Sequence, residues 1–140
     1  MPAVLLAILL TMADAPDPVD VVRELWGRIA ARDWDGFGRL LADDVVLELP
    51  ASGERFRGRA DVVAVNAEYP DGWSVEVLRV VGAGDQAVSE VEVPMAGVGV
   101  FRAASFWTVR DGLVVHGREY WTGLGADEAP AWRAQYAERP

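Results

Sequence analysis

Apolar and polar residues alternate along two neighbouring runs, Phe101–Arg110 and Leu113–Trp121, with Asp111-Gly112 between them. Strict alternation is typical of β-strands that bury one face, and Asp-Gly is a frequent hairpin turn. The stretch from Phe101 to Trp121 therefore predicts a β-hairpin. We expect the rest of the chain to pack around it.

The length of the hairpin loop is open from the sequence. A two-residue Asp111-Gly112 turn is possible, as is a three-residue loop with a left-handed glycine and a bulge. Because side chains alternate, the choice decides whether Glu119 or His116 shares a face with Trp107. The three-residue loop unites the apolar rows, so we adopt it. It points Glu119 into the apolar interior, near the small side chain of Ser105.

Upstream of the hairpin, the pattern predicts helices first and strands later. Asp17-Pro18 is typical of a helix start, and apolar residues at helical spacing follow as far as Ile29. The remaining predicted elements are a short helix from Asp33, strands over Asp44–Pro50 and Glu54–Arg57, a helix over Arg59–Glu68, strands over Trp73–Val81 and Ala87–Val93, and a short helix over Asp127–Glu138. This order indicates an α+β fold with helices on one face of a curved antiparallel sheet.

The length of 140 residues fits one domain. We predict an apolar N-terminal extension over residues 1–15, either disordered or a mis-assigned start, and a single domain over residues 16–140. The apolar run Val4–Met12 is too short to span a bilayer, and no basic residue precedes it as in a signal peptide. We therefore expect a cytoplasmic protein.

The amino-acid composition limits the partners and the kinds of reaction that the protein can have. The formal net charge is −9, which makes nucleic acid and anionic membranes poor partners. The chain has no Cys, one His, and only Arg among its 13 basic residues. Thiol nucleophiles, lysine Schiff bases and histidine-cluster metal sites are thereby excluded, and we expect no cofactor. Carboxylates, hydroxyls, Arg and a single His remain.

Glu119 is the first candidate for catalysis. It either pairs with a neighbouring Arg at the rim of the sheet, or lies buried among apolar side chains. Burial would raise its pKa and suit it to general acid or base chemistry near neutral pH. His116 falls on the opposite face, which favours a surface or interface position.

Several segments resemble the SnoaL-like branch of the nuclear transport factor 2-like superfamily. They are the opening helix, LLADDVVLELP, FRGRADVV and FWTVRDGLVVHGREYWT, and together they cover roughly residues 17–122. The resemblance implies a cystatin-like cone of curved sheet closed by N-terminal helices, and a homodimer formed through the outer sheet face. The superfamily contains isomerases, cyclases, epoxide hydrolases and non-catalytic binding modules, so the fold alone implies no activity.

The resemblance carries over to few site residues. Epoxide-hydrolase relatives have an acid in a REY-like stretch, which corresponds to Glu119. Their Arg and Asp correspond to Glu90 and Glu92, and their Tyr and Asn fall near Val46 and Glu48. Most of the epoxide-opening set is therefore missing.

A second acidic residue in the interior would strengthen the case for acid–base chemistry. The candidates are Glu48 and Glu90. Two carboxylates about 5 Å apart at an effective dielectric near 20 repel by roughly 3 kcal/mol, which keeps one of them protonated. Simple alternation predicts that the side chains of both residues point outward, because the neighbouring Val and Leu residues would occupy the inner face. The family alignment turns them inward.

The six tryptophans are numerous enough to line an apolar cavity as well as to fill a core. The predicted lining residues are Trp26, Trp34, Tyr69, Trp73, Phe101, Trp107 and Trp121. We expect a small, neutral, apolar ligand and cofactor-free isomerase, cyclase or hydrolase chemistry; the alternative is a non-catalytic binding or dimerisation module. A void of about 300 Å³ or more, reached by Glu119, would favour the first.

Overall fold

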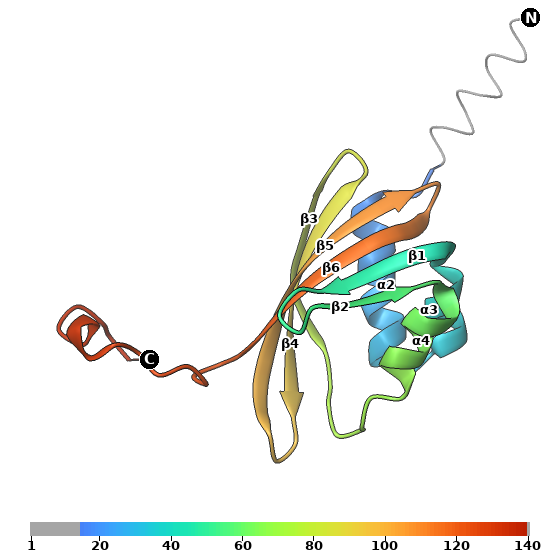
Figure 1. Ribbon diagram of the computed structural model, residues 1–140. Helices are drawn as coiled ribbons and strands as arrows, with labels where there is room; N and C mark the ends of the chain where they lie inside the picture. Colours follow the sequence, from blue (N-terminus) through green and yellow to red (C-terminus); the bar gives the residue numbers. More distant parts are fainter. Residues whose placement is uncertain (1–14, 140) are drawn as a thin grey trace, which may run out of the picture.

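The computed structural model describes residues 15–139 and confirms the α+β fold, with a six-stranded sheet and helices on one side of it (Figure 1). The helices are α2 (Pro18–Ala30), α3 (Trp34–Arg39) and α4 (Arg59–Ala67). The strands are β1 (Leu41–Leu49), β2 (Glu54–Arg57), β3 (Glu76–Ala83), β4 (Gln86–Met95), β5 (Gly99–Arg110) and β6 (Leu113–Gly123).

The strand order is β2-β1-β6-β5-β4-β3. Strands β3 to β6 form the antiparallel meander that the sequence predicts. Strand β1 pairs with β6 in parallel, a contact that local patterns do not predict because it joins segments far apart in the chain. The last strand therefore lies in the middle of the sheet.

Helix α2 begins as expected from its sequence. Asp17 accepts a hydrogen bond from the Val19 N–H at 2.8 Å, and Pro18 occupies the first turn. The apolar stripe that includes Leu25 and Ile29 is buried against β3, β4 and β5. This face of α2 supplies one wall of the interior.

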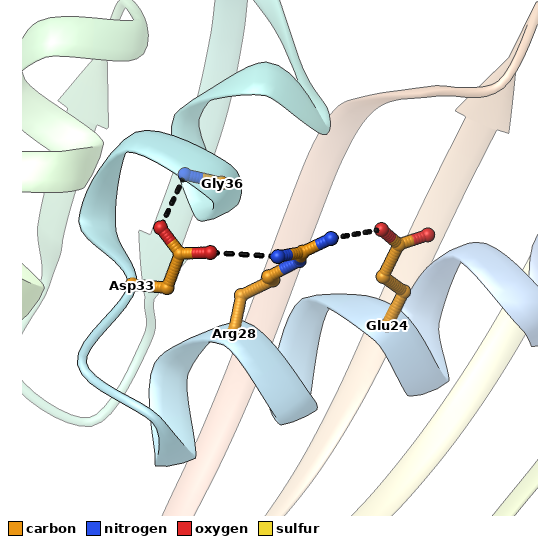
Figure 2. Close-up of polar contacts among 4 residues, drawn as sticks. All are labelled: Glu24, Arg28, Asp33 and Gly36. Carbon is orange, nitrogen blue, oxygen red and sulfur yellow. Dashed lines mark hydrogen bonds and ion pairs between the residues drawn. The ribbon is translucent and has the colours of Figure 1, made fainter.

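A short polar network joins α2 to α3 (Figure 2). Asp33 accepts a hydrogen bond from the Gly36 N–H at 2.9 Å and another from Arg28 at 2.7 Å, and Arg28 also contacts Glu24 at 3.1 Å. The bond from Gly36, followed by the one from Arg28, lowers the pKa of Asp33. The carboxylate thus caps α3 and ties it to α2.

The hairpin differs from the three-residue loop predicted above. Arg110 pairs directly with Leu113, and both turn residues have positive φ, 53° at Asp111 and 75° at Gly112, as in a two-residue type I′ turn. The bulge lies inside β6 instead. Thr108 pairs with His116 while its neighbour Val109 pairs with Val114, so Val115 is the extra residue.

The bulge restores the side-chain alternation that the shorter turn would have inverted. Beyond it, Glu119 pairs with Ser105, and both side chains are buried on the inner face. The predicted orientation of Glu119 is therefore found, although the loop prediction was wrong. Near the turn, Val114 takes the buried position instead of Leu113 and Val115.

Element ends also differ. Strand β3 begins at Glu76 rather than Trp73, and β1 begins at Leu41 rather than Asp44. The predicted C-terminal helix is reduced to a 3₁₀ turn, Ala131–Arg133; Trp132 within the turn and Tyr136 after it are both exposed. A short helix without a packing surface is not stable. The predicted N-terminal extension lies, except for Ala15, outside the described residues.

Candidate active site

A cavity of about 390 Å³ lies between the helices and the inner face of the sheet. Trp26 and Ile29 come from α2, Leu47 from β1, and Glu119 from β6. Most of the predicted aromatic lining is present: Trp26, Tyr69, Trp73, Phe101 and Trp121. The void reached by Glu119 is larger than the roughly 300 Å³ at which ligand pockets begin, so the space between the helices and the sheet is not filled by side chains alone.

Trp34 and Trp107 do not line this cavity, contrary to the prediction. Trp34 packs edge-on against Phe37 in α3, with ring centroids 6.3 Å apart. Trp107 is buried in the core beside Trp26, at 6.1 Å. An apolar pattern identifies residues that face inward, but it does not distinguish a packed core from the wall of a void.

Glu119 is only 6% exposed, and among the described residues its hydrogen-bond partner is the Ser105 hydroxyl, which donates to Oε2 at 2.7 Å. Burial raises the pKa of Glu119 from 4.5 to about 7, and the Ser105 bond opposes that rise. Within residues 15–139 no Arg pairs with this carboxyl group. Of the two alternatives left open by the sequence, the structure shows the buried acid.

The hydrogen bond from Ser105 also distinguishes the two oxygens of Glu119. Oε2 is occupied, so Oε1 is the oxygen left for a bound molecule or for the proton. With a pKa about 7, both the acid and the base form are populated near neutral pH. The site can therefore donate or accept a proton.

Ser89 holds two buried tryptophan side chains in place, and one of them, Trp26, lines the cavity. Its Oγ accepts hydrogen bonds from two indole N–H groups, Trp26 at 2.9 Å and Trp107 at 2.8 Å. Ser89 pairs with Ser105 across β4 and β5, and Ser105 pairs with Glu119 across β5 and β6. The sequence reasoning missed this buried polar row, although small hydroxyl residues at inward-facing strand positions could have indicated it.

Arg32 is a second residue that the sequence reasoning missed. Its guanidinium group lies 3.4 Å from the centroid of the Trp73 ring and donates to the Trp73 carbonyl oxygen at 2.5 Å. It also contacts Asp71 at 3.2 Å. Arg32 thereby joins the end of α2 to the irregular segment before β3, which forms part of the cavity wall.

The other candidate acids lie on the outer face of the sheet. Glu48 contacts His116 at 2.7 Å, and this hydrogen bond lowers the pKa of Glu48. Glu90 contacts Arg79 at 3.5 Å. The inward orientation implied by the family alignment is wrong for both, because Leu47 and Val91 occupy the neighbouring inner positions, as alternation predicted. Neither acid joins Glu119.

Within the part of the chain that the structure describes, no group of three or more His, Cys, Asp or Glu side chains is placed to hold a metal ion. The helices described there are also too short or too polar to cross a membrane.

Residues 22–117 match the SnoaL-like domain family. This match, together with the helix-covered sheet and its interior cavity, places the chain in the SnoaL-like branch of the nuclear transport factor 2-like superfamily. No curated protein matches the sequence.

Solved structures resemble the chain over most of its length. One is a "putative ketosteroid isomerase" from Kribbella flavida DSM 17836, with 34% identity over 88% of this chain and 89% of that one, and a TM-score of 0.81. A nuclear transport factor 2-like protein of unknown function from Burkholderia xenovorans LB400 has 30% identity over 86% and 93%, with a TM-score of 0.72.

An epoxide hydrolase of the limonene-epoxide-hydrolase type from M. tuberculosis shares the fold, with a TM-score of 0.65 over 75% of this chain and 82% of that one. Its identity is 20%, so the likeness extends to the fold alone.

Proposed function

We propose that the protein binds a small, neutral, largely apolar molecule in the interior cavity and that Glu119 acts on it as a general acid or base. The observation that carries the proposal is a buried carboxyl group with a pKa of about 7 at the wall of a cavity of about 390 Å³, which within residues 15–139 is hydrogen-bonded to Ser105 and paired with no Arg. The chemistry would be cofactor-free isomerisation, cyclisation or hydrolysis. A relative with 34% identity, assigned provisionally to the ketosteroid isomerases, supports this class.

The lining favours a neutral ligand. Aromatic and aliphatic side chains such as Trp26, Phe101 and Leu47 form most of the wall, and an anionic ligand would meet the ionised form of Glu119. We place the entrance at the end of the cavity where the lining residues Tyr69 and Trp121 are exposed.

Whether Glu119 acts as an acid or as a base depends on whether its carboxyl group is protonated. In its neutral form Glu119 can protonate a carbonyl or epoxide oxygen, and in its ionised form it can remove a proton from carbon or from water. The surrounding apolar wall strengthens either interaction by excluding water. Ser105 holds Oε2 and so orients Oε1 for the transfer.

The test is turnover of epoxide, ketosteroid and polyketide-like substrates by the wild type, Glu119→Gln and the matched outer-face control Glu90→Gln. We expect Glu119→Gln to lower turnover by at least about 100-fold, as for loss of a general acid or base, while the control stays within about twofold. Turnover that survives the Glu119 substitution would remove this residue from the mechanism. Tight binding of a neutral apolar probe without turnover would favour the binding module.

We also propose that the protein forms a homodimer through the outer sheet face. Phe106 and Tyr120 are 47% and 46% exposed there and pack edge-on against each other at 6.1 Å. Exposed aromatic pairs on an open sheet are typical of a surface that a partner covers. This role is compatible with either candidate function.

A further inference from the structure

A second, smaller cavity of about 10 Å³ adjoins the large one. The residues that line both cavities form the wall between them. They are Trp26, Ile29, Leu47, Asn66 and Glu119. Three of these side chains are mainly apolar, so Asn66 and Glu119 supply the polar side-chain groups at the junction.

The orientation of the Asn66 amide follows from its own helix. Nδ2 donates a hydrogen bond to the carbonyl oxygen of Val62, one turn earlier in α4, at 2.8 Å. The reversed amide would bring two acceptor oxygens together, so Nδ2 faces the helix backbone. Oδ1 therefore points away from that bond, and among residues 15–139 no donor is found for it.

From this geometry we infer that Asn66 is a specificity-determining residue, whose Oδ1 accepts a hydrogen bond from a hydroxyl group on a neutral, apolar ligand. The inference rests on the proposed ligand-binding function. A ligand that covered Oδ1 with carbon atoms would leave a buried acceptor without a donor, which weakens binding. A hydroxyl group avoids this, because it can donate to Asn66 and accept a hydrogen bond from the protonated form of Glu119.

The volume of the second cavity, which Asn66 and Glu119 both line, agrees with a hydroxyl group. A volume of about 10 Å³ is about what a single water-sized group requires, and it is too small for a ring. The apolar body of the ligand would fill the large cavity, with its hydroxyl group between Asn66 and Glu119. The same two residues could hold a free water molecule, so the experiment must separate the two sources of the hydroxyl group.

The test compares 1-naphthol with 1-fluoronaphthalene by isothermal titration calorimetry at pH 6. The two compounds have similar shapes, but only the first carries a hydroxyl donor. We expect the wild type to bind 1-naphthol roughly tenfold more tightly. Asn66→Leu should reduce this preference to within about twofold without weakening 1-fluoronaphthalene by more than about threefold. Ser52→Ala, which alters another polar residue of the lining, should keep the preference.

Binding of both compounds with equal affinity by the wild type would overturn the inference while the proposed function stood, and would point to a water molecule at the junction. A preference retained in Asn66→Leu would also overturn it. Binding of neither compound would overturn the proposed function and the inference together. A crystal structure of the wild type with 1-naphthol gives a reading independent of any variant: the hydroxyl oxygen should lie within hydrogen-bond distance of Asn66 Oδ1, and a position elsewhere would contradict the assignment.

Discussion

Glu119 makes folding depend on pH in a direction opposite to that of most carboxylates. Its pKa rises from 4.5 to about 7 on burial, so between these values the native state binds more protons than the unfolded state. The free energy of unfolding therefore falls as the pH rises through this range, and the loss is complete above about pH 7. The total is of the order of 3 kcal/mol.

The substitution Glu119→Gln should remove the loss of unfolding free energy that accompanies ionisation of the buried carboxyl group. The amide is neutral at every pH and can still accept the hydrogen bond from Ser105, so the variant should match the wild type near pH 4 and exceed its stability by up to about 3 kcal/mol near pH 8. Urea unfolding across that pH range measures the difference. If the free energies of unfolding of the two proteins changed with pH in parallel, Glu119 would not be buried as described.

The hairpin of β5 and β6 fixes the position of Glu119 through its turn and its bulge together. The positive φ angles at Asp111 and Gly112 define the two-residue turn, and the bulge at Val115 corrects the alternation beyond it. Either feature without the other would turn Glu119 toward the outer face.

Gly112→Ala tests this turn. The new Cβ would sit at a φ of 75° and 3.2 Å from Cγ of Pro16, so we expect a loss of about 1 kcal/mol or more in the free energy of unfolding. Asp111→Asn is the matched control, since Asn tolerates the left-handed conformation, and it should leave stability unchanged or slightly higher. Thermal or urea unfolding gives both values; a neutral Gly112→Ala would contradict the left-handed geometry.

How much the sequence predicts depends on how local the cause is. The Asp17-Pro18 helix start and the alternation that buries Glu119 are local, and both are found in the structure. The bulge at Val115 and the parallel pairing of β1 with β6 depend on contacts across the fold, and neither was predicted.

The candidate site shows the same division. Tryptophan content indicated an aromatic cavity, but only the packing of helices on the sheet decides that Trp73 lines the void while Trp107 fills the core. The alternation around Glu48 indicated an outward side chain correctly, whereas the family alignment did not. Asn66 carries no signal in the strand pattern, because it lies on a helix and reaches the cavity through the tertiary fold.

For the whole molecule, the two faces of the sheet carry different groups of side chains. The inner face carries the cavity and Glu119, and the outer face carries Phe106, Tyr120 and the Glu48–His116 pair. Substitutions can therefore test the proposed ligand binding and the proposed dimer independently.

Phe106→Glu tests the proposed dimer. A charge at the centre of the outer aromatic pair would have to be buried in the interface, so we expect a wild-type dimer and a monomeric variant in sedimentation velocity experiments. Val98→Glu, at an exposed apolar position in the β4–β5 turn, is the control and should remain dimeric. A monomeric wild type, or a dimer unaffected by Phe106→Glu, would place the interface elsewhere or exclude it.

The measurement that most directly tests the role of Glu119 is a titration of its side-chain carboxyl carbon by ¹³C NMR, with the Glu119→Gln spectrum identifying the resonance. The buried position at the cavity wall predicts a midpoint near pH 7. A midpoint near pH 4.5, the ordinary value for glutamate, would show a solvated carboxylate and contradict acid–base chemistry at this site.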